Sequence, residues 1–178
     1  MRLHFVDDNT EVVKALQATF KVHPEVEVTN GDLLKLARNC IVSPANSQGF
    51  MDGGIDKAFV TFFGSEIEAR VRTAIGRRPE GRLPVGSSLV INTVHAVIPF
   101  LLVAPTMESP EMVEAVNAYR AMRAILRIAT AHEEIGRAVY CPGLCTGVGG
   151  VLPSDAANQM LRTYEDWKGT QPTGRWTH

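Results

Sequence analysis

The stretch that most constrains this chain runs from Val42 to Asp56 and holds a proline, an asparagine and three glycines. The apolar run Cys40–Val42 that leads into it is typical of a buried strand end, and the run Ile55–Phe63 is typical of a helix. Backbone N–H groups of such a loop, beside a helix N-terminus, attract anions such as phosphate. The alternative is a loop that merely needs positive φ at its Gly53-Gly54 pair.

A second glycine-rich loop, Pro142–Gly150, follows the expected strand Ala138–Cys141. Glycine loops at two strand ends suggest a clamp on an extended anion such as a diphosphate. Neither loop has the Gly-Lys-Ser/Thr of a Walker A motif or the glycine spacing of a dinucleotide fingerprint.

Two polar residues extend this anion site toward a nucleotide. Asp32 directly follows a strand and a glycine, so it could accept a hydrogen bond from an exocyclic amine, or it could cap a helical turn over Leu33–Ala37. Asn46 could offer its amide to a ribose hydroxyl, or it could make a local Asx turn.

Strands alternate with helices along most of the chain, which predicts an α/β sandwich with a largely parallel sheet and helices on both faces. The remaining expected strands are Leu3–Val6, Val26–Val28, Ser88–Asn92 and Phe100–Ala104, the last two buried on both faces. The remaining expected helices are Glu11–Phe20 capped by Thr10, Glu66–Ile75 capped by Ser65, Ser109–Ala131, and Asp155–Trp167 capped by Ser154. Ligands of such sheets bind at the carboxyl ends of the strands, where both glycine loops lie.

Length and composition indicate one domain over residues 1–168 and a tail over 169–178. The net charge is −1, so we expect no bulk nucleic-acid binding and no attraction to an anionic membrane. The apolar runs are too short to span a bilayer, and early acidic residues argue against a secretory signal. Three cysteines without metal-type spacing favour a reduced, cytoplasmic chain with no metal site and no cofactor. The oligomeric state stays open.

The motifs together resemble a macro domain. The matching pieces are Gly31-Asp32-Leu33, Val42–Asn46, Gly53–Asp56 and Gly147–Gly150, whose order and spacing agree from about Val26 to about Leu161. This resemblance implies a three-layer α/β/α sandwich with a mixed, largely parallel central sheet that binds ADP-ribose. Some members of the family remove ADP-ribose from proteins or nucleic acids, or act on O-acetyl-ADP-ribose.

The resemblance also implies roles for single residues. Asp32, with Leu33 beside it, matches the aspartate that contacts the adenine amino group, and Asn46 matches the asparagine at the distal ribose. The first phosphate loop would be Gly53, Gly54 and Ile55. The second would be Thr146, Gly147, Val148, Gly149 and Gly150.

The sequence resembles two branches of the macro domain family in different positions. A catalytic aspartate of the MacroD type falls at Asp56, whereas the aromatic of that branch beside the distal ribose falls at Gly149. The terminal ADP-ribose glycohydrolase type resembles this chain at Gly49–Ile55, Ala104–Thr106 and Gly143–Gly150. Its catalytic lysine falls at Gly53 and its catalytic aspartate near Leu152, so neither is present.

The resulting prediction is an ADP-ribose-binding macro domain that hydrolyses an ADP-ribosyl linkage, with Asp56 and Asn46 as catalytic residues and Asp52 as the second candidate base. Asp56 could instead be an acidic residue favoured by the helix dipole. The alternatives are a reader that binds ADP-ribose without cleaving it and a macro-like structural protein. The partner is ADP-ribose or an ADP-ribosylated macromolecule. Phe50 could cover the ligand or pack, and Trp167 or Trp176 could shelter the adenine or dock the tail.

Overall fold

The computed structural model describes residues 1–171 and contains a six-stranded sheet in the order β2-β1-β6-β3-β5-β4. The strands are β1 (Leu3–Asp7), β2 (Val26–Asn30), β3 (Cys40–Ser43), β4 (Leu89–Asn92), β5 (Phe100–Val103) and β6 (Val139–Cys141). All neighbouring pairs are parallel except β4 with β5, which is antiparallel. The expected mixed, largely parallel sheet is therefore confirmed.

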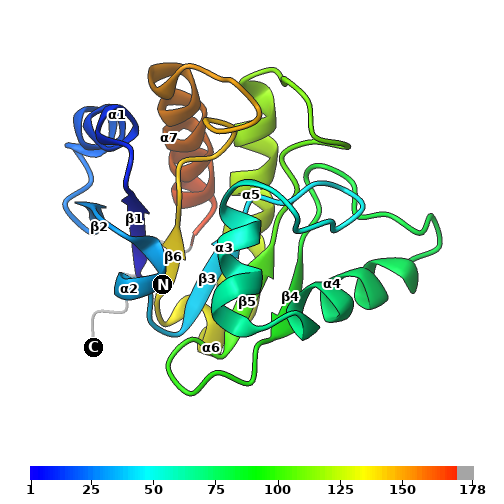
Figure 1. Ribbon diagram of the computed structural model, residues 1–178. Coiled ribbons are helices and arrows are strands. Elements are labelled where there is room, and N and C mark those ends of the chain that lie inside the picture. Colours follow the sequence, from blue (N-terminus) through cyan, green and yellow to red (C-terminus); the bar gives the residue numbers. More distant parts are fainter. Residues whose placement is uncertain (172–178) are drawn as a thin grey trace.

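Helices cover both faces of this sheet (Figure 1). They are α1 (Thr10–Phe20), α2 (Leu33–Leu36), α3 (Gly54–Phe63), α4 (Glu66–Gly76), α5 (Val116–Ala131), α6 (Glu133–Gly136) and α7 (Pro153–Thr170). The helices α1, α5 and α7 pack together on one face, while α3 and α4 pack together on the other. This is the expected three-layer α/β/α sandwich.

The alternation of strand side chains divides the core into two clusters, one on each face. In β3, Cys40 and Val42 belong to the cluster under α1, α5 and α7, whereas Ile41 belongs to the cluster under α3 and α4. In β5, Leu102 belongs to the cluster under α1, α5 and α7, and Leu101 belongs to the cluster under α3 and α4. Because both faces are covered, these central strands need apolar residues at every position.

The expectation that both late strands are buried on two faces is wrong for β4. Leu89 and Val90 are only partly buried, Asn92 is exposed, and Ser88 precedes the strand. The reason is position: β4 pairs only with β5 and lies at the edge of the sheet. An apolar run does not reveal which strand lies at an edge.

Two predicted helix caps are also wrong, and a third is right in position only. Asn9 caps α1, because its Oδ1 accepts the Glu11 N–H at 3.0 Å, and Thr10 is the first residue of the helix. Ser65 occupies the predicted N-cap position of α4, but its side chain makes no cap bond. Ser154 lies inside α7, which begins at Pro153. A proline at the first helical position suits a helix start, since its missing N–H has no partner there anyway.

The long helix α5 begins at Val116, not at Ser109 as expected. Residues 109–115 form an irregular segment that docks on the second glycine loop, where the Val113 N–H donates to the Gly149 carbonyl at 3.0 Å. This contact between distant parts of the chain replaces helical hydrogen bonds that a Pro-Glu start would otherwise favour.

The last helix, α7, extends to Thr170, three residues beyond the expected end at Trp167. Trp167 donates its Nε1–H to the Thr130 hydroxyl at 2.8 Å, so it ties α7 to α5. Residues 172–178 of the expected tail, including Trp176, lie outside the described residues. Within residues 1–171, none of the helices has the length and apolar composition that a bilayer crossing requires.

Candidate functional site

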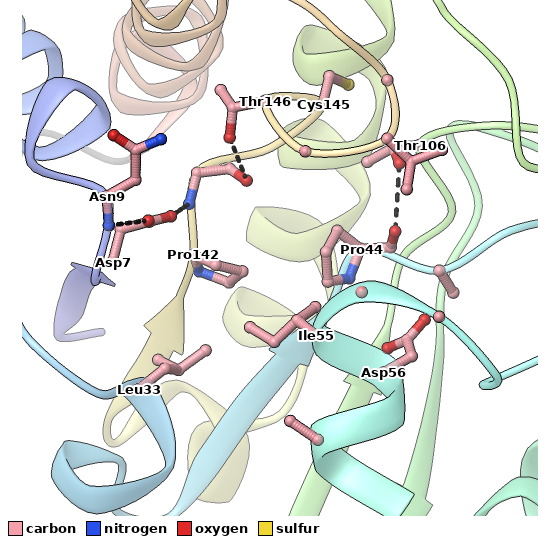
Figure 2. Close-up of a pocket in the computed structure, with 18 of the residues that line it drawn as sticks. Asp7, Asn9, Leu33, Pro44, Ile55, Asp56, Thr106, Pro142, Cys145 and Thr146 are labelled. Atoms are coloured by element: carbon pink, nitrogen blue, oxygen red, sulfur yellow. Dashed lines mark hydrogen bonds between the residues drawn. The ribbon is translucent and has the colours of Figure 1, made fainter.

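A cleft of about 620 Å³ opens at the carboxyl ends of the parallel strands. Its walls come from the segments that follow β1, β2, β3, β5 and β6 (Figure 2). It brings together the predicted site residues Asp32, Leu33, Asn46, Gly53, Gly54, Ile55, Asp56, Thr146, Gly147, Val148 and Gly149. Gly150 is not among the lining residues. Its N–H donates to the Gly147 carbonyl at 3.0 Å, and its φ of 66° closes the turn.

Asn46 fastens the first glycine loop with its own side chain. Its Oδ1 accepts the N–H groups of Gln48 at 3.1 Å and Phe50 at 3.3 Å, and its Nδ2 donates to the Phe50 carbonyl at 2.8 Å. The local Asx-type turn is therefore confirmed. An amide nitrogen has two hydrogens, so one N–H of Asn46 is not needed for these bonds.

The start of α3 presents backbone donors to the cleft. Gly53 occupies the N-cap position without a side-chain cap, and within residues 1–171 no acceptor takes the N–H groups of Gly54, Ile55 and Asp56. Such donors at a helix N-terminus favour an anion. Gly54 has a positive φ of 54°, whereas Gly53 is extended at −137°, so the expectation of positive φ holds for only one of the pair.

The second glycine loop presents backbone donors from the opposite wall. Two N–H groups are used within the loop, Gly150 to Gly147 and Val151 to Cys145, both at 3.0 Å. In the described chain, the N–H groups of Thr146, Gly147 and Val148 have no acceptor. Cys145 has a φ of 64°, an uncommon conformation for a residue with a side chain, and this turns the chain back on itself.

Gly149 cannot carry a side chain in this loop. A Cβ there would lie 2.7 Å from the Cys145 carbonyl oxygen and 3.0 Å from Cγ2 of Val113. The segment before α5 and the turn at Cys145 thus leave no room for a Cβ at this position. The aromatic side chain that the resemblance to the MacroD type would require at Gly149 does not fit here.

Asp7 is a structural residue of the cleft that the sequence reasoning missed. Its Oδ2 accepts the Gly143 N–H at 2.9 Å, and its Oδ1 accepts the Asn9 N–H at 2.9 Å (Figure 2). It therefore ties the end of β1 to the second glycine loop. The sequence does show a carboxylate directly after a short alternating strand. The residues around Asp7, however, do not indicate which distant loop it contacts.

Asp32 occupies the far end of the cleft, after β2. Its Oδ1 accepts the N–H groups of Leu34 at 3.0 Å and Lys35 at 3.3 Å, so the predicted helix cap is confirmed. Its Oδ2 lies 3.5 Å from the Lys35 ammonium, and the carboxylate is half exposed. The contact with an adenine amino group stays a prediction.

Asp56 is buried in the first turn of α3, with only 7 % of its surface exposed. The hydroxyl of Ser43, at the end of β3, donates to its Oδ1 at 2.6 Å. Burial raises the pKa of Asp56 to about 6, helped by the negative charge of Glu68 and opposed by the Ser43 hydrogen bond. Ser43 and Glu68 are the partners that the sequence reasoning missed.

The buried Thr106 contacts both glycine loops. The Thr106 hydroxyl donates to the Pro44 carbonyl at 3.2 Å and also lies against the Cys145 thiol. Burial raises the pKa of Cys145 to about 12, so this thiol stays protonated and is a packing group, not a nucleophile. Within residues 1–171, no group of three or more His, Cys, Asp or Glu side chains is placed to hold a metal ion.

Comparison with known proteins identifies this architecture. Residues 42–160 match the family model of the macro domain. An uncharacterised protein of Aquifex aeolicus (strain VF5) is 36 % identical over 138 residues, which cover 77 % of this chain and 79 % of the relative. A protein of Escherichia fergusonii named O-acetyl-ADP-ribose deacetylase is 27 % identical over 146 residues, 80 % of this chain and 79 % of that protein.

Solved structures share the fold. The macrodomain of Mycobacterium tuberculosis DarG superposes with a TM-score of 0.66 at 20 % identity, over 78 % of this chain and 88 % of that one. A mutant macrodomain of Oceanobacillus iheyensis with ADPR gives a TM-score of 0.68 at 20 % identity, over 81 % and 78 %. The family match covers more than half of the residues. The chain therefore belongs to the macro domain family.

Proposed function

We propose that the cleft binds ADP-ribose. The observation that carries this proposal is the pair of facing loops whose backbone N–H groups have no acceptor in the described chain, Gly54–Asp56 and Thr146–Val148. A diphosphate offers several anionic oxygens, and it would satisfy donors on both walls at once. In the orientation that the resemblance implies, the adenine would lie near Asp32 after β2 and the distal ribose near Asn46 after β3, and both residues line the cleft. Relatives named for ADPR and O-acetyl-ADP-ribose support the same ligand.

The remaining proposed contacts follow from this orientation. Leu33 lies against the base, Gly53, Gly54 and Ile55 hold one side of the diphosphate, and Gly149 and Gly150 shape the other loop.

We further propose that the protein hydrolyses an ADP-ribosyl linkage at the anomeric carbon of the distal ribose. Asp56 accepts a proton from the attacking water or orients it, and the bound diphosphate helps to place that water. The bond from the anomeric carbon to the target breaks with oxocarbenium-like character, and its electron pair leaves with the target group. The water oxygen bonds to the anomeric carbon, and the departing group takes up a proton from solvent or the one that Asp56 accepted. A pKa of about 6 leaves Asp56 mostly ionised at pH 7 and still close enough to neutrality to act as a base.

A second candidate is a reader that binds ADP-ribose without cleaving it. Two observations favour it: Asp56 is buried and already hydrogen-bonded to Ser43, and Asn46 uses most of its amide on its own loop. The proposed binding groups are mainly backbone N–H donors, which bind equally well without a catalytic side chain.

Calorimetry with free ADP-ribose tests the binding proposal, and the Asp32→Ser variant sharpens it. Serine can still cap α2 but offers no carboxylate to an amino group, so the fold is kept while recognition is lost. Loss of a hydrogen bond to a charged acceptor predicts binding roughly 10- to 100-fold weaker. Glu133→Gln removes an exposed carboxylate far from the cleft and should bind like the parent chain. No heat at millimolar ADP-ribose would exclude both candidates and leave a structural role.

Incubation with ADP-ribosylated protein, ADP-ribosylated oligonucleotide and O-acetyl-ADP-ribose separates enzyme from reader. An enzyme of the proposed kind releases free ADP-ribose from the modified protein or oligonucleotide, and Asp56→Asn lowers kcat/KM roughly 100-fold or more, the usual contribution of a general base. Release from O-acetyl-ADP-ribose alone breaks the acetyl ester and leaves the anomeric carbon untouched, so it would indicate a deacetylase instead. Asp52→Asn is the matched comparison, since Asp52 is exposed and also lines the cleft. Release that survives Asp56→Asn but not Asp52→Asn would move the assignment to Asp52. No release from any substrate that binds would favour the reader.

A further inference from the structure

A second hollow, shallow and open, lies beside the cleft with a volume of about 500 Å³. It is lined by Gln48, Phe50, Arg72, Thr73, Ile75, Gly76 and Gly81. Phe50 lines the cleft as well, so the two spaces lie on either side of this residue.

Arg72 is the charged group of the hollow. The central carbon of its guanidinium lies 4.4 Å from the centre of the Phe50 ring, a cation–π contact. Its stem packs on the first glycine loop, because a Cβ at Gly49 would lie 3.5 Å from Arg72 Cγ. Arg72 thus contacts both the Phe50 ring and the first glycine loop.

The N–H groups of Arg72 are unpaired in residues 1–171. Two nearby arginines do have partners: Arg70 donates to the Asn92 carbonyl at 3.1 Å, and Arg82 pairs with Glu108 at 3.3 Å. Glu68, one turn before Arg72, instead accepts the Met51 N–H at 3.4 Å. A guanidinium with free donors matches the two oxygens of a carboxylate.

We propose that this hollow is an accessory subsite for the protein target: it binds an acidic side chain next to the ADP-ribosylated residue of a peptide segment. The inference rests on the proposed function, which places the distal ribose at the Phe50 end of the cleft. Gln48 and Thr73 add uncharged hydrogen-bonding groups at the same place. A nucleic-acid strand fits less well, because it needs a row of cationic contacts, and the hollow offers one arginine on a chain of net charge −1.

Binding of three probes to the full chain tests this subsite. Two peptides carry ADP-ribose through an uncleavable linkage and differ only in flanking residues, glutamates in one and glutamines in the other. The third probe is an oligonucleotide with the same modification. Each is measured against the parent chain, Arg72→Gln and the control Arg127→Gln, which removes an exposed arginine of α5 that lines neither space.

We expect the parent chain to bind the glutamate peptide roughly 2- to 5-fold more tightly than the glutamine peptide, the effect of one solvent-exposed ion pair. Arg72→Gln should remove this difference while its affinity for free ADP-ribose stays unchanged, and Arg127→Gln should keep the difference. Equal binding of both peptides by the parent chain overturns the subsite but leaves ADP-ribose binding intact. A larger Arg72 effect on the oligonucleotide would also overturn it, in favour of nucleic acid. Failure of free ADP-ribose to bind would refute the proposed function itself.

Discussion

At the scale of single residues, the carboxyl group of Asp56 is subject to opposing influences. Burial and the charge of Glu68 disfavour its ionised form, whereas the Ser43 hydroxyl favours it. The balance is a pKa of about 6, so small changes around this group move its titration across the physiological range.

The two neighbours of Asp56 should therefore shift its titration in opposite directions. Ser43→Ala removes the donor that stabilises the carboxylate, so the pKa of Asp56 should rise above 6. Glu68→Gln removes a repelling charge, so the pKa should fall. Carbon-13 NMR titration of the carboxyl resonance measures both without depending on activity. If Asp56 is the base, the acid limb of the kcat/KM profile should move with the NMR value, and shifts in the same direction would contradict this account.

The raised pKa of Asp56 also makes a prediction about stability. The pKa of this carboxyl is about 6 in the folded state and about 3.8 in the unfolded state, so the folded state binds the proton more tightly. The free energy of unfolding therefore falls as the pH rises from about 3.8 through about 6. Asp56→Asn, which keeps an oxygen for Ser43, should increase the free energy of unfolding at pH 8 by up to about 3 kcal/mol. At pH 4 the gain should largely vanish. Urea denaturation at both pH values measures this, and an equal loss at both would show that packing dominates.

At the scale of elements, the cleft depends on how closely the second glycine loop approaches α1. A Cβ on Gly143 would lie 2.4 Å from Cγ1 of Val12 and 3.2 Å from the Asp7 carboxylate. The same carboxylate accepts the Gly143 N–H, so the loop cannot move away without losing that bond. Glycine is thus required here by close approach.

Gly143→Ala should therefore lower the free energy of unfolding by about 1–3 kcal/mol, the usual cost of overpacking. Gly147→Ala in the same loop is the matched control. A Cβ there meets nothing within 4 Å, so its effect should stay within about 0.5 kcal/mol. Chemical denaturation of the two variants in parallel gives the comparison. Equal effects would mean that the loop tolerates a shift at Gly143.

At the scale of the whole molecule, the layer order and the position of the cleft could be predicted, because apolar runs alternate with helical periods and the glycine loops follow strands. The strand order could not. The three-residue strand β6 lies between β1 and β3, and this depends on contacts between residues far apart in sequence. Asp7 was missed for the same reason, since its partner Gly143 is 136 positions away.

The wrong predictions of helix caps and of the sheet edge also arise because these features depend on tertiary contacts. Asn9 and Thr10 are both good caps in isolation, and the Asp7 bond to the Asn9 N–H fixes which of them precedes the helix. The start of α5 was misplaced because Val113 docks on Gly149. Local patterns describe elements, whereas their ends and partners are decided by tertiary contacts.

Because the proposed ligand would contact segments that follow β2, β3 and β6, it should stabilise the fold as a whole. At a concentration 100 times its Kd, a ligand that binds only the folded state adds about 2.7 kcal/mol. For a chain of this size that corresponds to a rise in Tm of about 5–10 °C. Asp32→Ser should have a ligand-free Tm close to that of the parent chain, since α2 keeps a cap, but should show a much smaller rise at the same ADP-ribose concentration. Differential scanning fluorimetry of both chains with ADP-ribose, and with ribose 5-phosphate as a ligand that lacks the adenine, measures this. If Asp32 recognises the base, the two chains should respond equally to ribose 5-phosphate and differ only with ADP-ribose; an equal rise with ADP-ribose would remove Asp32 from the binding site.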